Sequence, residues 1–378
     1  MGTQIINGKY TSATIFTTDN MEQAIDDYAL AQLRMLCDLE ANANCKIRVM
    51  PDVHPGKVGT IGLTMTLGSK IMPNLTGIDI GCGMSLIQIK DRKIEFQKLD
   101  KIIRDHVPSG YAIRKNVHHS VNSSMLDDLV CRKHIEAEKA LLSCGSLGSG
   151  NHFIEVDQDE DKNTYVIVHS GSRRLGKEIT EHYLKEGQRL LLSQGINIPY
   201  ELTYLENELM QNYLHDIAIA QEFARMNREV ILSELTKEMR WKVIDAYGCH
   251  HNYVEFDDTP ILRKGAISAR SGEKVIIPIN MRDGIILGTG LGNAEWNYSA
   301  PHGSGRIMKR EAVKNHFTLS QFKKSMSGIY SPSISKDTLD EAPFAYRGMD
   351  DIVDAIKDTV EITKIIRPVY NFKAGGED

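Results

Sequence analysis

Residues 78–83 read IDIGCG, a stretch that places a carboxylate at Asp79 and a thiol at Cys82 three residues apart. Glycine lacks a Cβ, so the glycines on both sides of the pair allow positive φ angles and leave little bulk around the two groups. A turn of this kind can direct both groups at one point. Cysteine is also among the most buried residue types, which keeps a packed core as the alternative. The glycine context favours a site.

Five histidines occur in similar surroundings, next to glycines or at the ends of apolar runs. They are His152 in GSGNHFIE, His169 in VHSGSRRLG, His250 and His251 in CHHNYVE, and His302 in APHGSGR. One histidine that closes a strand is more often a packed residue than a ligand, but five of them together with a carboxylate and a thiol favour a metal site. Imidazole and thiolate suit zinc, manganese, iron or cobalt, whereas magnesium and calcium need mainly oxygen ligands. A thiolate can also bridge two ions, so the sequence is compatible with a two-metal site.

Two further motifs indicate phosphate chemistry. Residues 302–306, HGSGR, place a histidine ahead of an expected helix whose free amide groups can hold a phosphate, so His302 could be a nucleophile. The alternative is a loop histidine in a tight turn. Residues 169–174, HSGSRR, supply Arg173, and an arginine fork matches phosphate oxygens. By spacing alone, the chain is expected to be a metalloenzyme that acts on phosphates.

Composition sets the outer bounds on function. The chain has 378 residues, of which 41% are hydrophobic and 25% charged, as is ordinary for a soluble globular protein. Its 45 basic and 50 acidic residues give a net charge of −5, so a polyanion would have to bind a local basic surface. The six cysteines show no CxxC spacing, the N-terminus lacks a signal-peptide pattern, and no run approaches eighteen apolar residues. We expect a cytoplasmic protein with no membrane span.

Helical periodicity alternates with short apolar runs that are typical of buried strands. Since the candidate ligands span Asp79 to His302 without a repeat or a convincing linker, most of the chain is expected to fold as one unit around one site. Asn20 is a candidate cap of the first helix, and Pro368 is expected to stop the last. Helices are expected over residues 20–43, 96–106, 124–142, 174–193, 206–243, 306–326 and 350–366, and strands over 46–50, 153–156, 165–169, 274–279 and 285–287, with 70–75 leading into the turn at 78–83.

Seven motifs occur in an order that resembles the RtcB family of RNA-splicing ligases. They are PDVHPGKVGTIG, IDIGCGM, GSGNHFIE, VHSGSRRLG, CHHNYVE, RKGAISAR and PHGSGR, and the match runs from residue 51 to residue 373. The resemblance implies an α+β fold in which residues 1–378 form a single RtcB-type domain, with mixed sheets around a central metal-binding cleft. It also implies two Mn²⁺ ions and GTP as cofactors.

The reaction implied by the resemblance joins an RNA 3′-phosphate or 2′,3′-cyclic phosphate to an RNA 5′-hydroxyl. The partner is then RNA with broken ends, either tRNA or another structured RNA, and the resemblance also suggests an archease-type activating protein. A monomer is the favoured state. Whether the natural task is splicing or repair does not follow from the sequence.

Residue roles carry over motif by motif. Cys82 would bridge the two Mn²⁺ ions, with Asp79 and His152 on one ion and His169 and His251 on the other.

The remaining roles concern the nucleotide and the RNA. His302 would take GMP onto its ring nitrogen, Asp52 would act as an acid when the cyclic phosphate is opened, and Arg173 would contact an RNA phosphate. The nucleotide would be contacted by Asn151, Glu155, Asn280, His302, Gly303, Ser304, Gly305, Tyr346 and Lys373.

One loop departs strongly from the family pattern. Where many members read PGSMG, residues 278–282 read PINMR, so larger and charged residues replace small ones. We expect Arg282 to contact a nucleotide or RNA phosphate. The alternative is that Arg282 points to solvent or pairs with Asp283.

Two other functions are compatible with these residues. A two-metal RNA-end phosphatase or cyclic phosphodiesterase would keep the metal ligands without nucleotidyl transfer, although His302 in an intact turn argues against it. A non-catalytic RNA-repair factor of the same fold would tolerate loss of Cys82, which a ligase would not.

Overall fold

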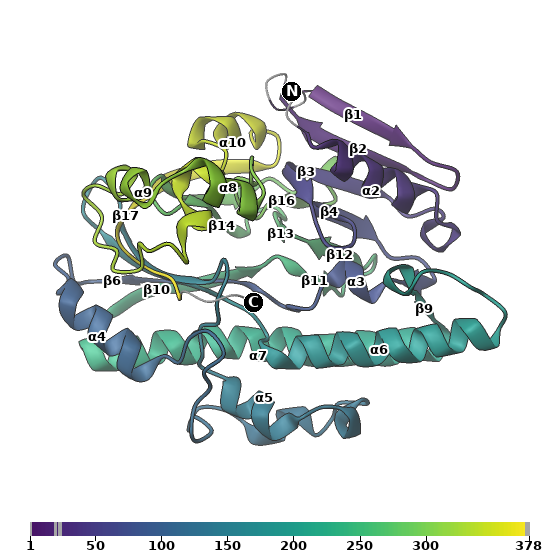
Figure 1. Cartoon of the computed structure of the whole chain (residues 1–378), viewed down its shortest axis with the longest axis horizontal. Helices are drawn as coiled ribbons and strands as arrows, with labels where there is room; N and C mark the ends of the chain where they lie inside the picture. Colours follow the sequence, from purple (N-terminus) through teal and green to yellow (C-terminus); the bar gives the residue numbers. More distant parts are fainter. Residues whose placement is uncertain (1, 19–20, 22–24, 375–378) are drawn as a thin grey trace.

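Two large β-sheets form the frame of the protein, which a computed structural model describes for residues 2–18, 21 and 25–374 (Figure 1). The proposed Asn20 cap lies outside these residues. The first sheet is mixed, because β2 and β3 run parallel whereas its other neighbouring strands run antiparallel. Its strands, in spatial order, are β1 (Gly2–Asn7), β2 (Ser12–Thr17), β3 (Ile47–Pro55), β4 (Thr60–Thr66), β12 (Ile261–Lys264) and β11 (Asn252–Glu255).

The second large sheet is antiparallel between all its paired strands and carries most of the candidate site. In spatial order its strands are β10 (Val243–His250), β6 (Gly83–Ile89), β8 (Thr164–Ser170), β7 (Phe153–Gln158), β17 (Val360–Phe372), β15 (Gly284–Gly290) and β14 (Lys274–Asn280). Two small sheets pair β13 (Ala266–Ser268) with β16 (Ser299–Pro301) and β5 (Lys70–Ile71) with β9 (Leu205–Glu206).

The helices lie around these sheets, and the two longest run along one side of the molecule (Figure 1). They are α6 (Arg174–Ser193) and α7 (Asn207–Met239), and α5 (Ala137–Ser143) lies on their far side from the sheets. The other helices are α2 (Asp27–Cys37), α3 (Pro73–Thr76), α4 (Phe96–His106), α8 (Arg310–His316), α9 (Leu319–Ser325) and α10 (Met349–Ala355). None of the helices within the described residues is long and apolar enough to cross a membrane.

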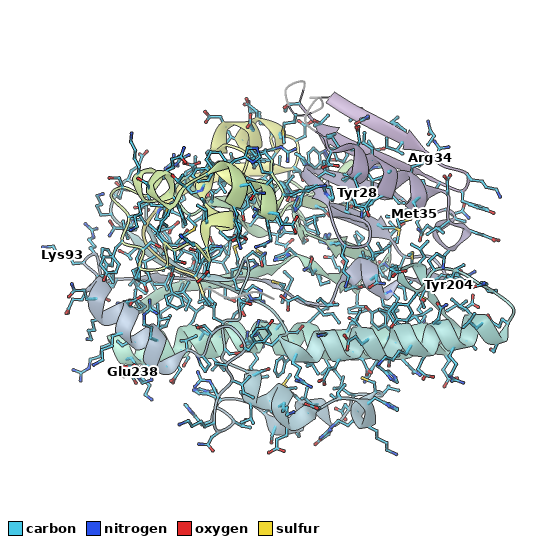
Figure 2. The ribbon with its side chains drawn as sticks, in the orientation of Figure 1. Tyr28, Arg34, Met35, Lys93, Tyr204 and Glu238 are labelled. Carbon is cyan, nitrogen blue, oxygen red and sulfur yellow. The ribbon has the colours of Figure 1, made fainter. Side chains whose placement is uncertain are left out.

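The helix α7 joins the two main parts of the hydrophobic core. Its first half contributes Tyr213, Ile217 and Phe223 to the core under the six-stranded sheet, and its second half contributes Ile231 and Leu235 to the core under the seven-stranded sheet. Tyr204 and Glu238, which lie near the two ends of this helix, are far apart along the molecule (Figure 2). One element therefore packs against both sheets, and the described residues form a single body of mixed helices and strands, as the α+β prediction requires.

Several predicted elements are confirmed closely. The helices expected over 96–106 and 174–193 are α4 and α6, and the strands expected over 153–156, 165–169, 274–279 and 285–287 lie within or nearly coincide with β7, β8, β14 and β15. The helix expected over 206–243 ends earlier, because Arg240 takes a left-handed conformation and β10 then begins at Val243. The strand expected over 46–50 continues to Pro55, so Asp52 belongs to β3 and not to a loop.

Five other expectations about helices or strands were wrong in extent or type. The segment 350–366 forms only the short α10 before the 13-residue strand β17, which pairs with β7 on one side and β15 on the other. The segment 306–326 is split into α8 and α9, because Thr318 begins a new helix with a capping box. Residues 124–142 contain two 3₁₀ turns before α5, and the helix within 20–43 spans 27–37 among the described residues. The strand expected in 70–75 stops at Ile71, because Pro73 begins α3.

The turn at 78–83 lies directly against α7, which explains its glycines. Gly81 has a φ of +70°, and a Cβ at this position would lie 2.8 Å from the Cα of Gln221 and 2.9 Å from the Cβ of Ala224. A larger residue would therefore push the turn away from the helix.

Candidate active site

The pairing of four adjacent strands brings the candidate metal ligands together. The start of β6 lies opposite the end of β10 on one side and the end of β8 on the other, and the start of β7 also lies opposite the end of β8. Cys82, His152, His169 and His251 each lie at or next to one of these strand ends, and Asp79 lies on the turn that leads into β6. The sheet register thus gathers residues that are up to 172 positions apart in sequence.

The five predicted metal ligands form a continuous row of donor atoms. Asp79 Oδ2 lies 3.0 Å from His152 Nε2, which lies 3.4 Å from Cys82 Sγ. Cys82 Sγ in turn lies 3.3 Å from His169 Nε2, which lies 2.9 Å from His251 Nε2. Within the described residues, Cys82, His152 and His169 have ligand atoms that all lie within 4.8 Å of one another. Because the thiol is at the centre of the row, it is the group that could bridge two ions.

The protonation of these groups fits a cation site. Burial, together with neighbouring positive groups, lowers the pKa of His169 and of His251 well below its usual range, so both rings are neutral. The backbone oxygen of Asn151 can only accept the Nδ1–H of His169, 3.1 Å away, which leaves the lone pair of His169 on Nε2. Burial and the Asp79 charge raise the pKa of the Cys82 thiol, so a thiolate here needs a bound cation to stabilise it. The donor set and its charges therefore fit a transition metal.

Arg173 lies beside this row, and its guanidinium is occupied by contacts within the protein. Its Nη1 lies 3.4 Å from Nδ1 of His152, and its Nη2 donates to the backbone oxygen of Gly110 at 3.1 Å. Since an arginine can only donate, the proton of the His152 ring is then on Nε2, where it faces the Asp79 carboxylate. A metal on His152 Nε2 requires that proton to leave Nε2. Metal binding and the present Arg173 contact therefore compete.

A cleft next to the metal ligands contains every residue predicted to contact the nucleotide. It has about 710 Å³ of space that protein atoms do not fill, a volume that includes its open mouth. Its walls include Asn151, Glu155, Asn280, His302, Gly303, Ser304, Gly305, Tyr346 and Lys373, together with His169 and His251 from the metal row.

His302 lies where the cleft meets the metal row, with its ring centre 4.8 Å from that of His251. Its Nδ1 lies 2.6 Å from Oδ2 of Asp52, which is fully buried and comes from β3. A carboxylate accepts the Nδ1–H, so the lone pair of the His302 ring is on Nε2. Asp52 itself is not among the residues that line the cleft.

Sequence reasoning missed the acidic centre of the cleft, Glu341. Its carboxylate binds Lys373 Nζ at 2.8 Å, accepts the hydroxyl of Tyr346 at 2.7 Å and lies 3.3 Å from Nη1 of Arg306 and 2.9 Å from Nη1 of Arg310. Burial opposes ionisation of this carboxyl, but the charges of Lys373, Arg310 and Arg306 lower its pKa to about 2. Glu341 thus holds two predicted nucleotide contacts, Tyr346 and Lys373, in place.

Glu155 lines another wall of the cleft, and a second buried carboxyl group, that of Asp157, lies beside it outside the lining. Glu155 and Asp157 point to the same face of β7, and Asn371 donates from the neighbouring strand β17 to Glu155. Burial raises the pKa of both carboxyl groups, and the Glu155 charge raises that of Asp157 further. The sequence singled out Glu155 by its motif but gave no signal for Asp157.

The loop at 278–283, which includes the departure from the family pattern, is stabilised by hydrogen bonds and an ion pair among its own side chains. The side-chain oxygen of Asn280 accepts from the backbone amides of Arg282 and Asp283, and its nitrogen donates to the Asp283 carboxylate at 2.8 Å. Arg282 forms a two-fold ion pair with Asp283, at 2.8 and 3.0 Å, and its side chain is 47% exposed. Arg282 thus has the pairing with Asp283 that was the alternative to a phosphate contact. Asn280 borders the cleft while its side chain stabilises the turn.

His54 and Met281 also line the cleft without having been predicted. Burial lowers the pKa of His54 to about 4, so its ring is neutral, and its Nδ1 donates to the backbone oxygen of Asp52 at 2.8 Å. His54 stands in the PDVH motif, and its position two residues after Asp52 on a strand was the only signal that could have placed it here.

Comparison with known proteins identifies the family of this arrangement. The family model described as tRNA-splicing ligase RtcB matches residues 32–135 and 123–374. The chain is 30% identical over 366 residues to RNA-splicing ligase RtcB of Escherichia coli K12, an alignment that covers 86% of this chain and 90% of the relative. It is 27% identical over 456 residues to tRNA-splicing ligase RtcB of Nanoarchaeum equitans, covering 95% and 94% of the two chains, and 27% identical over 403 residues to that of Archaeoglobus fulgidus, covering 82% and 83%. These matches span both the metal row and the cleft, and the chain belongs to the RtcB family of RNA ligases, which are enzymes.

Proposed function

We propose that this protein is a GTP- and Mn²⁺-dependent ligase that joins RNA 3′-phosphate or 2′,3′-cyclic phosphate ends to 5′-hydroxyl ends through a guanylylated His302. The observation that carries the proposal is the position of His302, which lines the cleft and lies next to the row of metal-ligand atoms. A nucleotide bound in the cleft could thus present a phosphate to both. We also propose that residues 1–378 act as one domain and that the substrate is a structured RNA with broken ends.

The metal centre would be held by the five residues of the donor row. Cys82 would bridge two ions, with Asp79 and His152 on one side and His169 and His251 on the other, as the order of the atoms in the row suggests. Bound Mn²⁺ would neutralise phosphoryl oxygens and orient the groups that react. Arg173 would leave His152 when the site is loaded, and its fork would then be available to an RNA phosphate.

His302 would act as the nucleophile because Asp52 sets its protonation. The carboxylate holds the proton on Nδ1, so Nε2 can attack the α-phosphorus of GTP, forming a P–N bond while the bond to pyrophosphate breaks. An oxygen of the RNA 3′-phosphate then attacks the same phosphorus, and the P–N bond breaks to return the free ring. The contact with His302 and the absence of Asp52 from the cleft walls favour a positioning role for Asp52 over direct protonation of the RNA.

The second half of the reaction follows from the leaving group. A 3′-phosphate has no good leaving group, whereas the guanylylated end can release GMP when the RNA 5′-hydroxyl attacks the 3′-phosphorus. A 2′,3′-cyclic phosphate must first be opened by water to a 3′-phosphate. Capping by His302 is therefore the step that makes the ligation possible.

The base would be recognised at the wall formed by Glu155 and Lys373. Ionised Glu155 can accept from the N–H groups of guanine, and Tyr346 offers a ring that Glu341 and Arg306 hold in place. Asn151 lies close to both the metal row and Lys373, because its backbone oxygen contacts His169 Nδ1 at 3.1 Å and Lys373 Nζ at 3.4 Å. This position supports a contact between Asn151 and the nucleotide phosphates.

A joining assay with defined RNA ends tests the proposal. RNA with a 3′-phosphate or a 2′,3′-cyclic phosphate and RNA with a 5′-hydroxyl are incubated with the protein, with GTP and Mn²⁺ added singly and together. Joined product only when both are present is expected. Conversion of the ends without joining and without GTP would instead identify a phosphatase or cyclic phosphodiesterase, and RNA binding without any change of the ends would identify a repair factor.

A further inference from the structure

Arg228 of α7 is fully buried and bonds to the segments that carry the candidate metal ligands. Its Nη1 donates to the backbone oxygens of Gly81 at 2.9 Å and Ser170 at 2.8 Å, and its Nε donates to the hydroxyl of Ser85 at 3.1 Å. Its Nη2 lies 3.2 Å from Nδ1 of His250. One guanidinium thus contacts β6, β8, β10 and the turn before β6.

Three of these four contacts lie next to a candidate ligand in the sequence, and Ser85 lies three residues after Cys82. Gly81 precedes Cys82, Ser170 follows His169, and His250 precedes His251. Two of the contacts are made to backbone oxygens, which do not depend on the neighbouring side chains. Arg228 therefore ties together the three strand ends that supply the centre and one side of the donor row.

The contacts of Arg228 do not resemble those of a structural ion pair. None of the hydrogen bonds that it makes to the described residues goes to a carboxylate. A buried charge without an ionic partner is costly unless its hydrogen bonds are satisfied by a fixed environment. Here that environment is the backbone of the metal-binding segments, so the position of the charge and the positions of the ligands depend on each other.

Asn227, the neighbouring residue on α7, extends the same arrangement and is also fully buried. Its side-chain oxygen accepts from the backbone amides of Gly145 at 2.7 Å and Ser146 at 3.1 Å, in the segment that leads to the predicted ligand at 152. Its side-chain nitrogen donates to the Ser170 hydroxyl and to the backbone oxygen of Gly171, both at 3.0 Å. The two adjacent residues together reach all four ligand-bearing segments.

We propose that Arg228, supported by Asn227, is the positioning residue that holds the metal ligands in place before an ion binds. This inference rests on the proposed metal centre. The planar fork of arginine is suited to this task, because it donates in several fixed directions at once, whereas a lysine ammonium at the same place keeps the charge but cannot reproduce the fork. Loss of the fork should therefore weaken metal binding even when the positive charge is retained.

Titration of metal-stripped protein with Co²⁺ alone tests the role, with absorbance reporting both affinity and thiolate ligation. Arg228→Lys should bind Co²⁺ roughly 10- to 100-fold more weakly than the parent, as is typical when an outer contact of a metal site is lost, and should show a weaker thiolate-to-cobalt band. Arg225→Lys is the matched control on the same helix, because Arg225 is exposed and bonds to Glu222 and Glu229 of α7. This control should bind Co²⁺ as the parent does.

A second variant keeps the test decisive if Arg228→Lys does not fold. Ser85→Ala removes one acceptor of the guanidinium and changes little else, so it should keep the thermal unfolding temperature near that of the parent while binding Co²⁺ several-fold more weakly. Parent-like Co²⁺ affinity and spectrum in folded Arg228→Lys, or in Ser85→Ala if the first variant is unfolded, would overturn the positioning role. Absence of Co²⁺ binding by the parent protein would instead overturn the proposed metal centre, which distinguishes the two failures.

Discussion

At the scale of single residues, the candidate site depends on groups whose protonation is set by their neighbours. Burial keeps His169 and His251 neutral, the Asp52 carboxylate holds a proton on Nδ1 of His302, and Glu341 remains ionised because three cations surround it. Each of these states is the one that the proposed chemistry needs. The motifs identify the reactive groups, whereas the neighbours that prepare them come from distant parts of the chain.

The proposed bridging role of Cys82 predicts a large effect from one substitution. Cys82→Ala should remove most of the bound transition metal, because one thiolate would serve two ions. Cys249→Ala is the matched control, since Cys249 lies two residues before the predicted ligand His251 but its Sγ contacts only the backbone oxygen of Ile276, at 3.8 Å, in the hydrogen bonds described. Metal analysis of the purified proteins should show loss in the first and retention in the second. Full metal content in Cys82→Ala would exclude the bridge.

The raised pKa of Glu155 predicts a pH-dependent affinity for GTP. Because burial favours the protonated carboxyl, the ionised form that accepts from guanine becomes populated only at a pH above the usual carboxyl range of about 4.3. GTP affinity should therefore increase as the pH rises through the pKa of Glu155. Equilibrium binding at fixed Mn²⁺ over a pH series measures this dependence, and Glu155→Gln should flatten it. A pH dependence that is the same in both proteins would assign it to other groups.

At the scale of elements, local patterns predict structure well where an element is surface-exposed on one face. The helices α4 and α6 have the ends that their periodicity and flanking residues predict. The segment 350–366 fails because its apolar spacing is also compatible with a helix, whereas pairing with β7 and β15 makes residues 360–372 a central strand. Such a choice depends on strands that lie far away in sequence.

The candidate site shows the same division between local and distant information. Its candidate ligands and the proposed nucleophile stand in short motifs, and the family resemblance singled out part of the lining of the cleft, but not Glu341, His54 or Met281. Glu341 and Arg228 could not be predicted, because they act through partners 32 and 147 residues away, Lys373 and Gly81, and no local pattern marks them. For Arg282, the motif indicated a changed loop, but only the structure shows that Asp283 neutralises it.

The ion pair of Arg282 predicts that its removal has little effect on binding. Arg282→Ala should change the affinities for GTP and for RNA by less than about threefold, since an exposed ion pair with an adjacent residue contributes little. Titrations with GTP and with a nicked RNA measure both values. A drop of tenfold or more in either affinity would show that Arg282 leaves Asp283 to contact the ligand.

The close packing of the 78–83 turn on α7 predicts a specific cost for a methyl group. Gly81→Ala should destabilise the protein and reduce its metal content, because the new Cβ would meet the backbone of α7 at a positive φ. Gly195→Ala is the control, since Gly195 also has a positive φ, +77°, but has nothing within 4 Å of an added Cβ. The control should lose about 1 kcal/mol of stability from backbone strain alone and keep its metal. Equal losses of stability and unchanged metal in both variants would contradict the packing argument.

At the scale of the whole molecule, the seven-stranded sheet and α7 connect the row of candidate metal ligands to the neighbouring cleft. The row lies at the ends of β6, β7, β8 and β10, while β17 carries the chain to Lys373 at the cleft wall. Since α7 packs under both large sheets, the two parts of the site are supported by one helix and one continuous sheet. The C-terminal segment is therefore part of the frame and not an accessory.

Removal of β17 tests this view of the whole molecule. A chain that ends at residue 359 should fail to fold cooperatively, because β17 is the strand between β7 and β15 and its loss would divide the sheet. Circular dichroism and thermal unfolding compare it with the full chain. A truncated protein that unfolds at the temperature of the full chain would show that the sheet does not need this strand.

Mapping the adduct tests whether His302 carries the guanylate. The protein is incubated with GTP and Mn²⁺, digested under non-acidic conditions and analysed by mass spectrometry, with His302→Ala as the comparison. We expect the added mass of GMP on the peptide that contains His302, lability of that bond in acid, and an adduct-free His302→Ala protein that still binds its metal. GMP on a peptide containing His54 or Lys373, or an adduct that persists in His302→Ala, would contradict this role of His302.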